Sequence, residues 1–341
     1  MRNRNFVYSL EFLRDGRPLA SVRVTPDFAP VIEAARWAAL RHGVPPAEAL
    51  MAPACVEPRW NETLGQPYAS GLVASALIGD RREGSVDVPQ RYFGDYARIA
   101  TTSLVERGLA HTGESLAYLV AAYASSAPVE DARARAEGDL HTEELPADLD
   151  VGSASLERRI DGATWLGPRV EGDAPVVITR DVLNEALGLV ERHVDVEAGG
   201  FLIGHVCRDT ATGDIFIDVT DWLPARHTQS TLSTLTFTPE TWCEARAALA
   251  LRRRGEVFLG WIHTHPVTAI CRAQGCSDAA QQQCPMARDY FSDHDRFLHK
   301  TMFPRAHGLA LVINDWKGAP PSASLFGYRS GLIDLRGFHV A

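Results

Sequence analysis

The first 125 residues carry apolar patterns of two periods, one typical of strands and one of helices. Residues 7–12 and 19–24 alternate apolar and polar side chains around Asp15-Gly16, which predicts a β-hairpin with one buried face. After Pro26, apolar residues recur near helical spacing and predict a helix. Three further stretches predict a helix at 92–109 and, without deciding between strand and helix, apolar elements at 69–79 and 116–123.

In the second half of the chain, strand-like and helix-like patterns follow one another. Short continuous apolar runs predict buried strands, and runs with a period near 3.6 predict helices. Thr179 precedes the first of these helices, where its hydroxyl can cap a free backbone N–H. The expected order is β-α-β-β-α-β-α-β-β, with strands at 176–179, 199–204, 215–220, 257–262, 308–313 and 324–328 and helices at 180–192, 241–253 and 296–300.

Length and composition fit a globular α/β protein of two domains. The chain has 341 residues, which exceeds one typical domain. We expect a small N-terminal α/β domain at 1–125, for which packing or partner binding is the preferred role because it shows no catalytic motif. Residues 126–155 are rich in Asp and Glu and predict a flexible linker. Residues 156–341 then form a second domain, a sheet flanked by helices.

Charge and cysteine content limit the expected binding partners and cellular location. The formal net charge of −9 gives no support to nucleic-acid binding, which favours a basic face. No apolar run approaches the length of a membrane span, so no membrane association is expected. Charged residues soon after the N-terminus leave no signal-peptide core. The six cysteines are sparse, so a reducing cytoplasm is the expected location.

Two histidines one residue apart follow the apolar run at 257–262. If this run is a strand, His263 and His265 point to the same side, because strand side chains alternate. Two imidazoles at one strand end can bind one metal ion, and Asp295 is the candidate third ligand. Three protein ligands with an open fourth position are typical of catalytic zinc. A lone His-x-His is weak, however, since such a pair can simply be exposed or hydrogen-bonded.

The order of the surrounding residues strengthens the metal interpretation. Glu197 precedes Gly199-Gly200, the segment His263-Thr264-His265-Pro266 follows, and Ser292-Asp293-His294-Asp295 comes last. This set resembles the signature of the JAB/MPN (JAMM) zinc metalloproteases, which include deubiquitinase-like isopeptidases. The resemblance covers residues 174–330, about half of the chain. It implies a cytidine-deaminase-like JAB/MPN fold with a mixed sheet flanked by helices, and a prokaryotic member of the family.

One departure from the family pattern lies between the histidines and the serine. The segment from Val267 to Phe291 intervenes and is longer than the family usually has. Ser277 would give a shorter spacing, but Ala280 stands three residues later, and alanine cannot bind a metal. Ser292 and Asp295 are therefore the preferred register, and residues 267–291 are an insertion placed to shape substrate access.

The resemblance implies metal-assisted amide hydrolysis. His263, His265 and Asp295 would hold Zn²⁺, which lowers the pKa of its water toward neutrality. Glu197 would accept the proton of that water and pass it to the leaving amine, while Ser292 would stabilise the oxyanion. Two structural alternatives stay open. Glu197 could be a surface carboxylate at a helix end, and Ser292 could be only the N-cap of the helix that carries Asp295.

Other residues near the motif have weaker claims to function. His294 is expected to face outward, with metal or substrate binding as the alternative, and His205 and Cys207 are expected to be structural. A second, structural zinc with a fourth ligand from elsewhere is one interpretation of the insertion, although unligated thiols suit the spacing equally well. The cysteines concerned are Cys271, Cys276 and Cys284.

The preferred hypothesis is a zinc-dependent isopeptidase that hydrolyses the amide bond after the C-terminal tail of a ubiquitin-like protein. It would deconjugate that protein or process its precursor, with E1- or E2-like proteins as further partners. The alternatives are a catalytically silent MPN-type binding scaffold, a metallohydrolase acting on another peptide or sulfur-carrier conjugate, and a role linked to nucleic acid. The filled ligand positions argue against the scaffold, and the acidic charge argues against nucleic acid.

Overall fold

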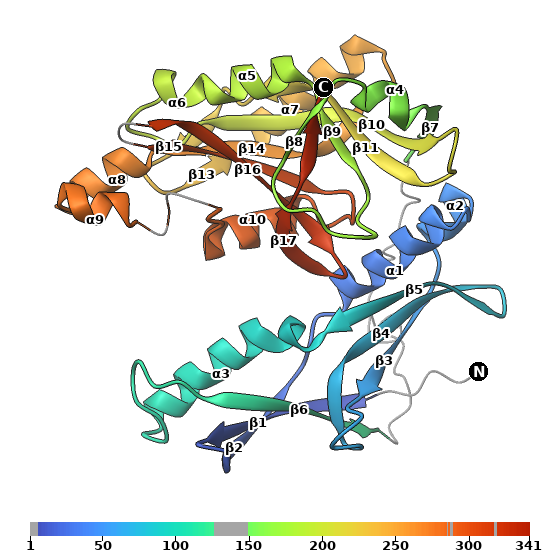
Figure 1. The fold of residues 1–341 in the computed structure, drawn as a ribbon, viewed down its shortest axis with the longest axis vertical. Coiled ribbons are helices and arrows are strands. Elements are labelled where there is room, and N and C mark those ends of the chain that lie inside the picture. The colour runs from blue at the N-terminus through green and yellow to red at the C-terminus, as the bar shows by residue number, and fades with distance from the viewer. Residues whose placement is uncertain (1–5, 126–148, 285, 287–288, 317–318) are drawn as a thin grey trace, which may run out of the picture. The chain divides into compact units, whose positions relative to one another are not determined.

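The computed structural model describes residues 6–125, 149–284, 286, 289–316 and 319–341. They form two compact units, each with its own sheet (Figure 1). The first contains the described residues up to 125 together with Ser330–Leu332, and the second contains those from 149 to 329 and Ile333–Ala341. Within these ranges, no helix combines the length and the apolar character that crossing a membrane requires.

The first unit is built on an antiparallel sheet. Its hairpin turns at Asp15 and Gly16, with φ angles of 49° and 75°, the left-handed conformation that an Asp-Gly turn adopts. Both apolar runs that suited strand or helix are strands, β4 and β6. The strand order is β2 (Arg17–Val24), β1 (Phe6–Arg14), β6 (Ala117–Ala124), β4 (Tyr68–Ile78) and β3 (Ala54–Trp60), with β5 (Arg81–Pro89) paired to β4 and helices α1 (Ala29–Arg41), α2 (Pro46–Ala49) and α3 (Gly94–Glu106) completing the unit.

Two strands of this sheet are absent from the sequence prediction. Residues 47–68 show no regular apolar pattern, yet they contain β3. Its Pro58 obscures the pattern, because proline has no N–H to donate to a neighbouring strand. Since β3 lies at the edge of the sheet and pairs with β4, a proline is tolerated there. β5 escapes the apolar pattern because it opens with the charged residues Arg81-Arg82-Glu83.

The second unit is built on a mixed ten-stranded sheet with helices packed on it, so the α/β class is confirmed. β14 lies within the sheet, antiparallel to β10 and parallel to β15. The sheet path is β17-β16-β15-β14-β10-β11-β9-β18-β8, with β7 paired to β10. Its strands are β7 (Val151–Ala154), β8 (Thr164–Leu166), β9 (Val176–Ile178), β10 (Gly199–Asp209), β11 (Ile215–Pro224), β14 (Val257–His265), β15 (Leu309–Trp316), β16 (Ala319–Arg329), β17 (Leu332–Arg336) and β18 (Phe338–Val340).

Helices and a small hairpin connect these strands, largely in the expected order. The helix expected at 180–192 is divided at Gly188 into two, and the insertion at 267–291 contains two short helices. The connecting elements are α4 (Leu156–Ile160), α5 (Arg180–Leu187), α6 (Leu189–Arg192), the hairpin β12 (Thr228–Ser230) and β13 (Leu235–Phe237), α7 (Pro239–Arg252), α8 (Val267–Ala273), α9 (Asp278–Gln282) and α10 (Asp293–Met302).

The expected linker at 126–155 needs one correction. Residues 126–148 lie outside the described residues. Residues 151–154, however, form β7, which pairs in parallel with β10 from Val206 to Asp209. This end of the predicted linker is therefore wrong. The segment Val151-Gly152-Ser153-Ala154 carries too few apolar residues to show a strand pattern. It pairs with the end of β10 that extends beyond the pairing of β10 with β14.

An aromatic core covers the sheet face that carries His263. Trp242 of α7 and Phe303 after α10 pack on Phe201 of β10, with ring centroids 4.5 Å and 6.5 Å from it. The same cluster includes Trp261, two residues before His263 on β14. In Figure 1, α5 and α6 lie on the other side of this sheet from α10. The predicted site residues therefore lie between the sheet and α10.

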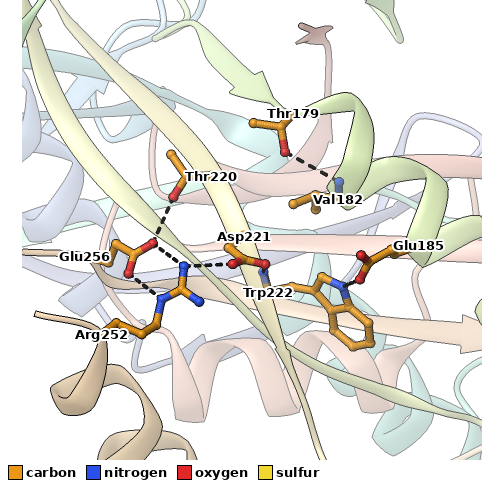
Figure 2. Close-up of polar contacts among 8 residues, drawn as sticks. All are labelled: Thr179, Val182, Glu185, Thr220, Asp221, Trp222, Arg252 and Glu256. Atoms are coloured by element: carbon orange, nitrogen blue, oxygen red, sulfur yellow. Dashed lines mark hydrogen bonds and ion pairs between the residues drawn. The ribbon is translucent and has the colours of Figure 1, made fainter. Parts of the chain in front are cut away.

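Charged side chains join the end of α7 to β11 (Figure 2). The guanidinium of Arg252 lies 2.6 Å and 2.8 Å from the Glu256 carboxylate and 2.7 Å from that of Asp221. Glu256 also accepts a hydrogen bond from the Thr220 hydroxyl at 3.3 Å. Since Glu256 immediately precedes β14, these contacts position the start of the strand that ends in the two histidines.

Helix α5 is held at its start and on its side. Thr179 Oγ1 accepts a hydrogen bond from the Val182 N–H at 3.4 Å, so the predicted cap is confirmed (Figure 2). Near the end of the helix, Glu185 accepts from the indole N–H of Trp222 on β11 at 2.8 Å. The cap stabilises the helix start, and the Trp222 contact attaches α5 to the sheet in addition to its buried apolar face.

Candidate metal centre

His263, His265 and Asp295 come together in the second unit. The two Nε2 atoms lie 3.0 Å apart, His263 Nε2 lies 3.3 Å from Asp295 Oδ1, and His265 Nε2 lies 3.4 Å from Asp295 Oδ2. All three side chains are buried, with exposures of 0%, 2% and 3%. The alternation of β14 places both imidazoles on the face toward α10, which supplies the carboxylate.

The donor spacing is close to that of a tetrahedral ion, although the two Nε2 atoms are slightly nearer than zinc would hold them. Zinc bonds of about 2.0–2.2 Å to nitrogen and oxygen separate the ligand atoms of a tetrahedron by about 3.3–3.6 Å. Without a cation or a shared proton, imidazole lone pairs and carboxylate oxygens held this close would repel one another. The residues present can therefore hold a metal ion with three donors, and the donor set of two imidazoles and one carboxylate is one that zinc accepts.

The environment keeps the three donors in the states that bind metal. Burial lowers the pKa of His263, against the raising effect of the Asp295 charge, so its imidazole stays neutral. Burial alone would raise the pKa of Asp295, but the neighbouring imidazoles of His263 and His265 outweigh it and lower the pKa. A neutral imidazole and an ionised carboxylate are the forms that bind metal.

Ser292 orients the carboxylate of Asp295. As the N-cap of α10, its hydroxyl oxygen accepts from the Asp295 N–H at 3.0 Å, and its own N–H donates to Asp295 Oδ2 at 2.8 Å. This reciprocal capping box satisfies two free donors at the helix start. It also occupies Oδ2 and leaves Oδ1 free for a metal. The capping alternative for Ser292 is therefore present, and it still leaves the hydroxyl proton available to donate.

Asn314 orients His265. It lies opposite His265 on the parallel strand β15, and its Oδ1 lies 3.1 Å from His265 Nδ1. Because a carbonyl oxygen only accepts, His265 donates from Nδ1 and its Nε2 keeps a lone pair for a metal. Metal-binding histidines usually donate their second N–H in this way. The sequence alone gives no sign of this role for Asn314, since it depends on the pairing of β14 with β15.

Trp261 and His299 support His263. The indole of Trp261 stacks on the imidazole of His263, with ring centroids 4.2 Å apart and planes 11° apart. Its N–H donates to Nδ1 of His299 on α10 at 3.1 Å. Burial lowers the pKa of His299 to about 3, so His299 remains a neutral acceptor. The sequence places both residues in buried elements but gives no sign of this stack.

Glu197 lies beside the centre without joining its donors. It is buried, with 4% exposure, so the surface alternative does not fit. Gly199 faces His263 in the β10–β14 ladder, and the Thr264 N–H donates to the Ala198 carbonyl at 2.8 Å, which extends the pairing toward Glu197. Burial raises the pKa of Glu197 to about 9, and the nearby charge of Asp295 adds to this. A cation held by the neighbouring donors would lower this pKa, and a general base at this position needs that ionised form.

His294 differs from its expected outward orientation. It is half-buried, and its Nε2 is buried without a hydrogen-bond partner in the described part of the chain. Its position in the first turn of α10, next to Asp295, explains this burial. His205 and Cys207 lie on β10, where Cys207 is buried in a small apolar cluster, as expected for structural residues. The three cysteines of the insertion are not part of this centre.

Comparisons with known proteins do not identify the chain. No protein-family profile matches it, and no curated protein matches it. Among solved structures, the chain is similar to the solution structure of protein DSY2949 from Desulfitobacterium hafniense, with 20% sequence identity and a TM-score of 0.32. That likeness covers 47% of this chain and 89% of the other. The function is therefore inferred from the geometry of the site and the motif residues.

Proposed function

We propose that the chain is a zinc-dependent isopeptidase of the JAB/MPN kind, acting on the amide bond after the C-terminal tail of a ubiquitin-like protein. One observation carries the proposal. His263, His265 and Asp295 form a buried three-donor group with contacts of 3.0, 3.3 and 3.4 Å, and the buried Glu197 carboxyl lies beside it. The motif order and the mixed sheet with packed helices are compatible with the family.

The side chains around this group suit amide hydrolysis. A bound zinc ion supplies an acidic water and polarises the scissile carbonyl. Glu197 is placed outside the donor set, where a general base is required, and can pass its proton to the leaving amine. The Ser292 hydroxyl accepts from the Asp295 N–H, so its own proton can point toward a developing oxyanion. His263, His265 and Asp295 serve only to hold the ion.

The test combines hydrolysis with metal analysis on the full-length protein. The probe is ubiquitin with a fluorogenic amide on its C-terminal glycine, used at several protein concentrations. We expect hydrolysis by the zinc-loaded protein and a loss of at least about 100-fold in kcat for Glu197→Gln, because a positioned general base contributes about 10²–10⁴-fold. Glu197→Gln should keep its zinc, whereas H263A/H265A should lose one equivalent.

Two results would contradict the proposal. Full activity of purified Glu197→Gln would show that Glu197 is not the general base. Wild-type protein that takes up no zinc, even when refolded with it, would favour a binding scaffold instead. Hydrolysis of an isopeptide-linked lysine conjugate of ubiquitin, followed on the same variants, then separates deconjugation from precursor processing.

A further inference from the structure

The insertion between β14 and α10 has little apolar surface with which to hold its second helix. α8 is anchored, because Val267 and Ile270 are buried and the Thr268 N–H donates to Asp315 at 2.9 Å. From residue 272 to residue 284, the sequence contains no large apolar side chain. α9 has five residues, too few for a helix that is stable alone. A segment without an apolar core needs another staple, such as a metal ion or a disulfide.

The end of α8 brings two thiols together through its backbone. The Gly275 N–H donates to the Arg272 carbonyl at 3.1 Å, and the Cys276 N–H donates to the Cys271 carbonyl at 3.0 Å. These are the two hydrogen bonds of a Schellman motif, with Gly275 in the left-handed conformation at φ 69°. The motif commonly packs the third-last helical residue against the second residue after the cap. Here those residues are Cys271 and Cys276.

α9 returns a third thiol to the same place. The side-chain amide of Gln281 donates to the Cys276 carbonyl at 3.0 Å, and the Cys284 N–H donates to the Gln281 carbonyl at 3.1 Å. Cys271 is buried and stands between the other two thiols. Burial, together with its hydrogen bonds to Cys284 and Cys276, raises its pKa to about 12. Cys276 and Cys284 are partly buried, so all three thiols lie at least partly inside the α8–α9 segment.

We propose that Cys271, Cys276 and Cys284 bind a structural zinc ion that holds α9 onto α8. Thiolates are preferred zinc ligands, and a fourth protein donor would complete the closed coordination of a structural site. Within the described residues, only His263, His265 and Asp295 are already spaced as a three-donor group. The three thiols do not meet that spacing, so binding the ion requires α9 to move relative to α8, in the usual coupling of structural zinc to local folding.

This site is separate from the proposed catalytic centre, and metal content distinguishes the two. Zinc is measured by elemental analysis on full-length protein purified under reducing conditions. The variants are C271S/C276S/C284S, H263A/H265A and the control Cys243→Ser, whose thiol is exposed on α7. We expect two equivalents in wild type and in Cys243→Ser, and one in each of the other two variants.

Cobalt gives a spectroscopic check that does not depend on activity. In Co²⁺-loaded protein, we expect a sulfur-to-metal charge-transfer band in the near ultraviolet for wild type and H263A/H265A and no such band for C271S/C276S/C284S. Equal zinc in wild type and the triple cysteine variant, or no band in wild type, would overturn the proposal. So would a disulfide among these cysteines, detected by thiol counting after denaturation. Unchanged zinc content in H263A/H265A would contradict the catalytic centre and would leave the cysteine site supported.

Discussion

Asn314 and Trp261 each contact one histidine of the candidate centre without offering a donor to the metal. Asn314 accepts from His265 Nδ1, and Trp261 stacks on His263 while donating to His299. Since neither histidine has more than 2% exposure, water does not compete for these contacts. The orientation of each imidazole is thus determined by one neighbour on its own strand or the next.

Asn314 provides a test of this orientation. Replacing it with Leu keeps the volume but leaves the His265 N–H buried without an acceptor. We expect zinc affinity to fall by about 10–100-fold, the usual effect of removing such a supporting contact. Competition with a zinc chelator of known affinity measures the change. Asn314→Asp, which keeps the acceptor, is the control, and equal affinities for the Leu and Asp variants would refute the assigned role.

Single site residues could be predicted where a pattern in the neighbouring sequence pointed to them. The His263–His265 pair was predicted because the period of a strand places alternate side chains on one face. Asp295 came from its spacing after Ser292 in a motif, and the structure brings it to the histidines. Asn314 and His299 had no local signal, because their contacts depend on which strand and which helix pack against β14.

At the scale of elements, α10 combines a helix start with a metal donor. Its capping box uses Asp295 at the third helical position. The same carboxylate therefore accepts the free N–H of Ser292 at the helix start and also faces the histidines. The sequence predicted the helix and the cap. It did not predict β3 or β5, because Pro58 and a charged start hide the strand pattern when the edge position and the neighbour β4 are unknown.

Substitutions at Ser292 separate its capping role from a catalytic one. Ser292→Ala should lower the free energy of unfolding by about 0.5–2 kcal/mol, whereas Ser292→Gly should lower it by only a few tenths, because glycine is a tolerated N-cap. Both remove the hydroxyl, so both should lose about 10²–10³-fold in kcat if it donates to the oxyanion. Denaturant unfolding and probe hydrolysis measure the two effects. Activity that tracks stability would show that Ser292 only caps.

The network at the start of β14 predicts a pH dependence of stability. The hydrogen bond from Arg252 lowers the pKa of Glu256 despite the opposing effect of burial, whereas in the unfolded chain it is about 4.3. Its stabilising contribution is therefore complete above that pH and is lost as pH falls through the lower, folded pKa.

We expect Glu256→Gln to be less stable than wild type by about 1.5–3 kcal/mol near pH 7, the range for a hydrogen bond to a charged group. The difference should shrink as pH falls below the unfolded pKa. Thermal unfolding of both proteins across this pH range measures the difference. A difference that stays constant with pH would contradict the assignment.

At the scale of the whole molecule, the candidate centre belongs to one of two compact units. His263, His265 and Asp295 all lie between residues 149 and 329. A ligand that binds only the folded state stabilises the cooperative unit that holds it, by about 2.7 kcal/mol at a hundredfold excess over Kd. The two units should therefore respond differently to zinc.

Hydrogen exchange tests this difference. In zinc-loaded wild type, amides of β10, β14 and β15 should exchange more slowly than in H263A/H265A, by up to about 100-fold for opening free energies of this size. Amides of β1, β4 and β6 should exchange at the same rate in both. Equal slowing in both sheets would show that the metal stabilises the chain as a single cooperative body.

The burial of all three donors also bears on how the ion arrives. With exposures of 0%, 2% and 3%, the donors leave an ion only the approach that the proposed substrate would also use, so uptake is easiest before β14 and α10 have packed. Exchange with free ions is then slow, and the divalent ion available to the nascent chain decides the occupant. Since affinity alone ranks copper and nickel close to or above zinc, the identity of the bound metal becomes a property of the cell's ion supply at the time of synthesis.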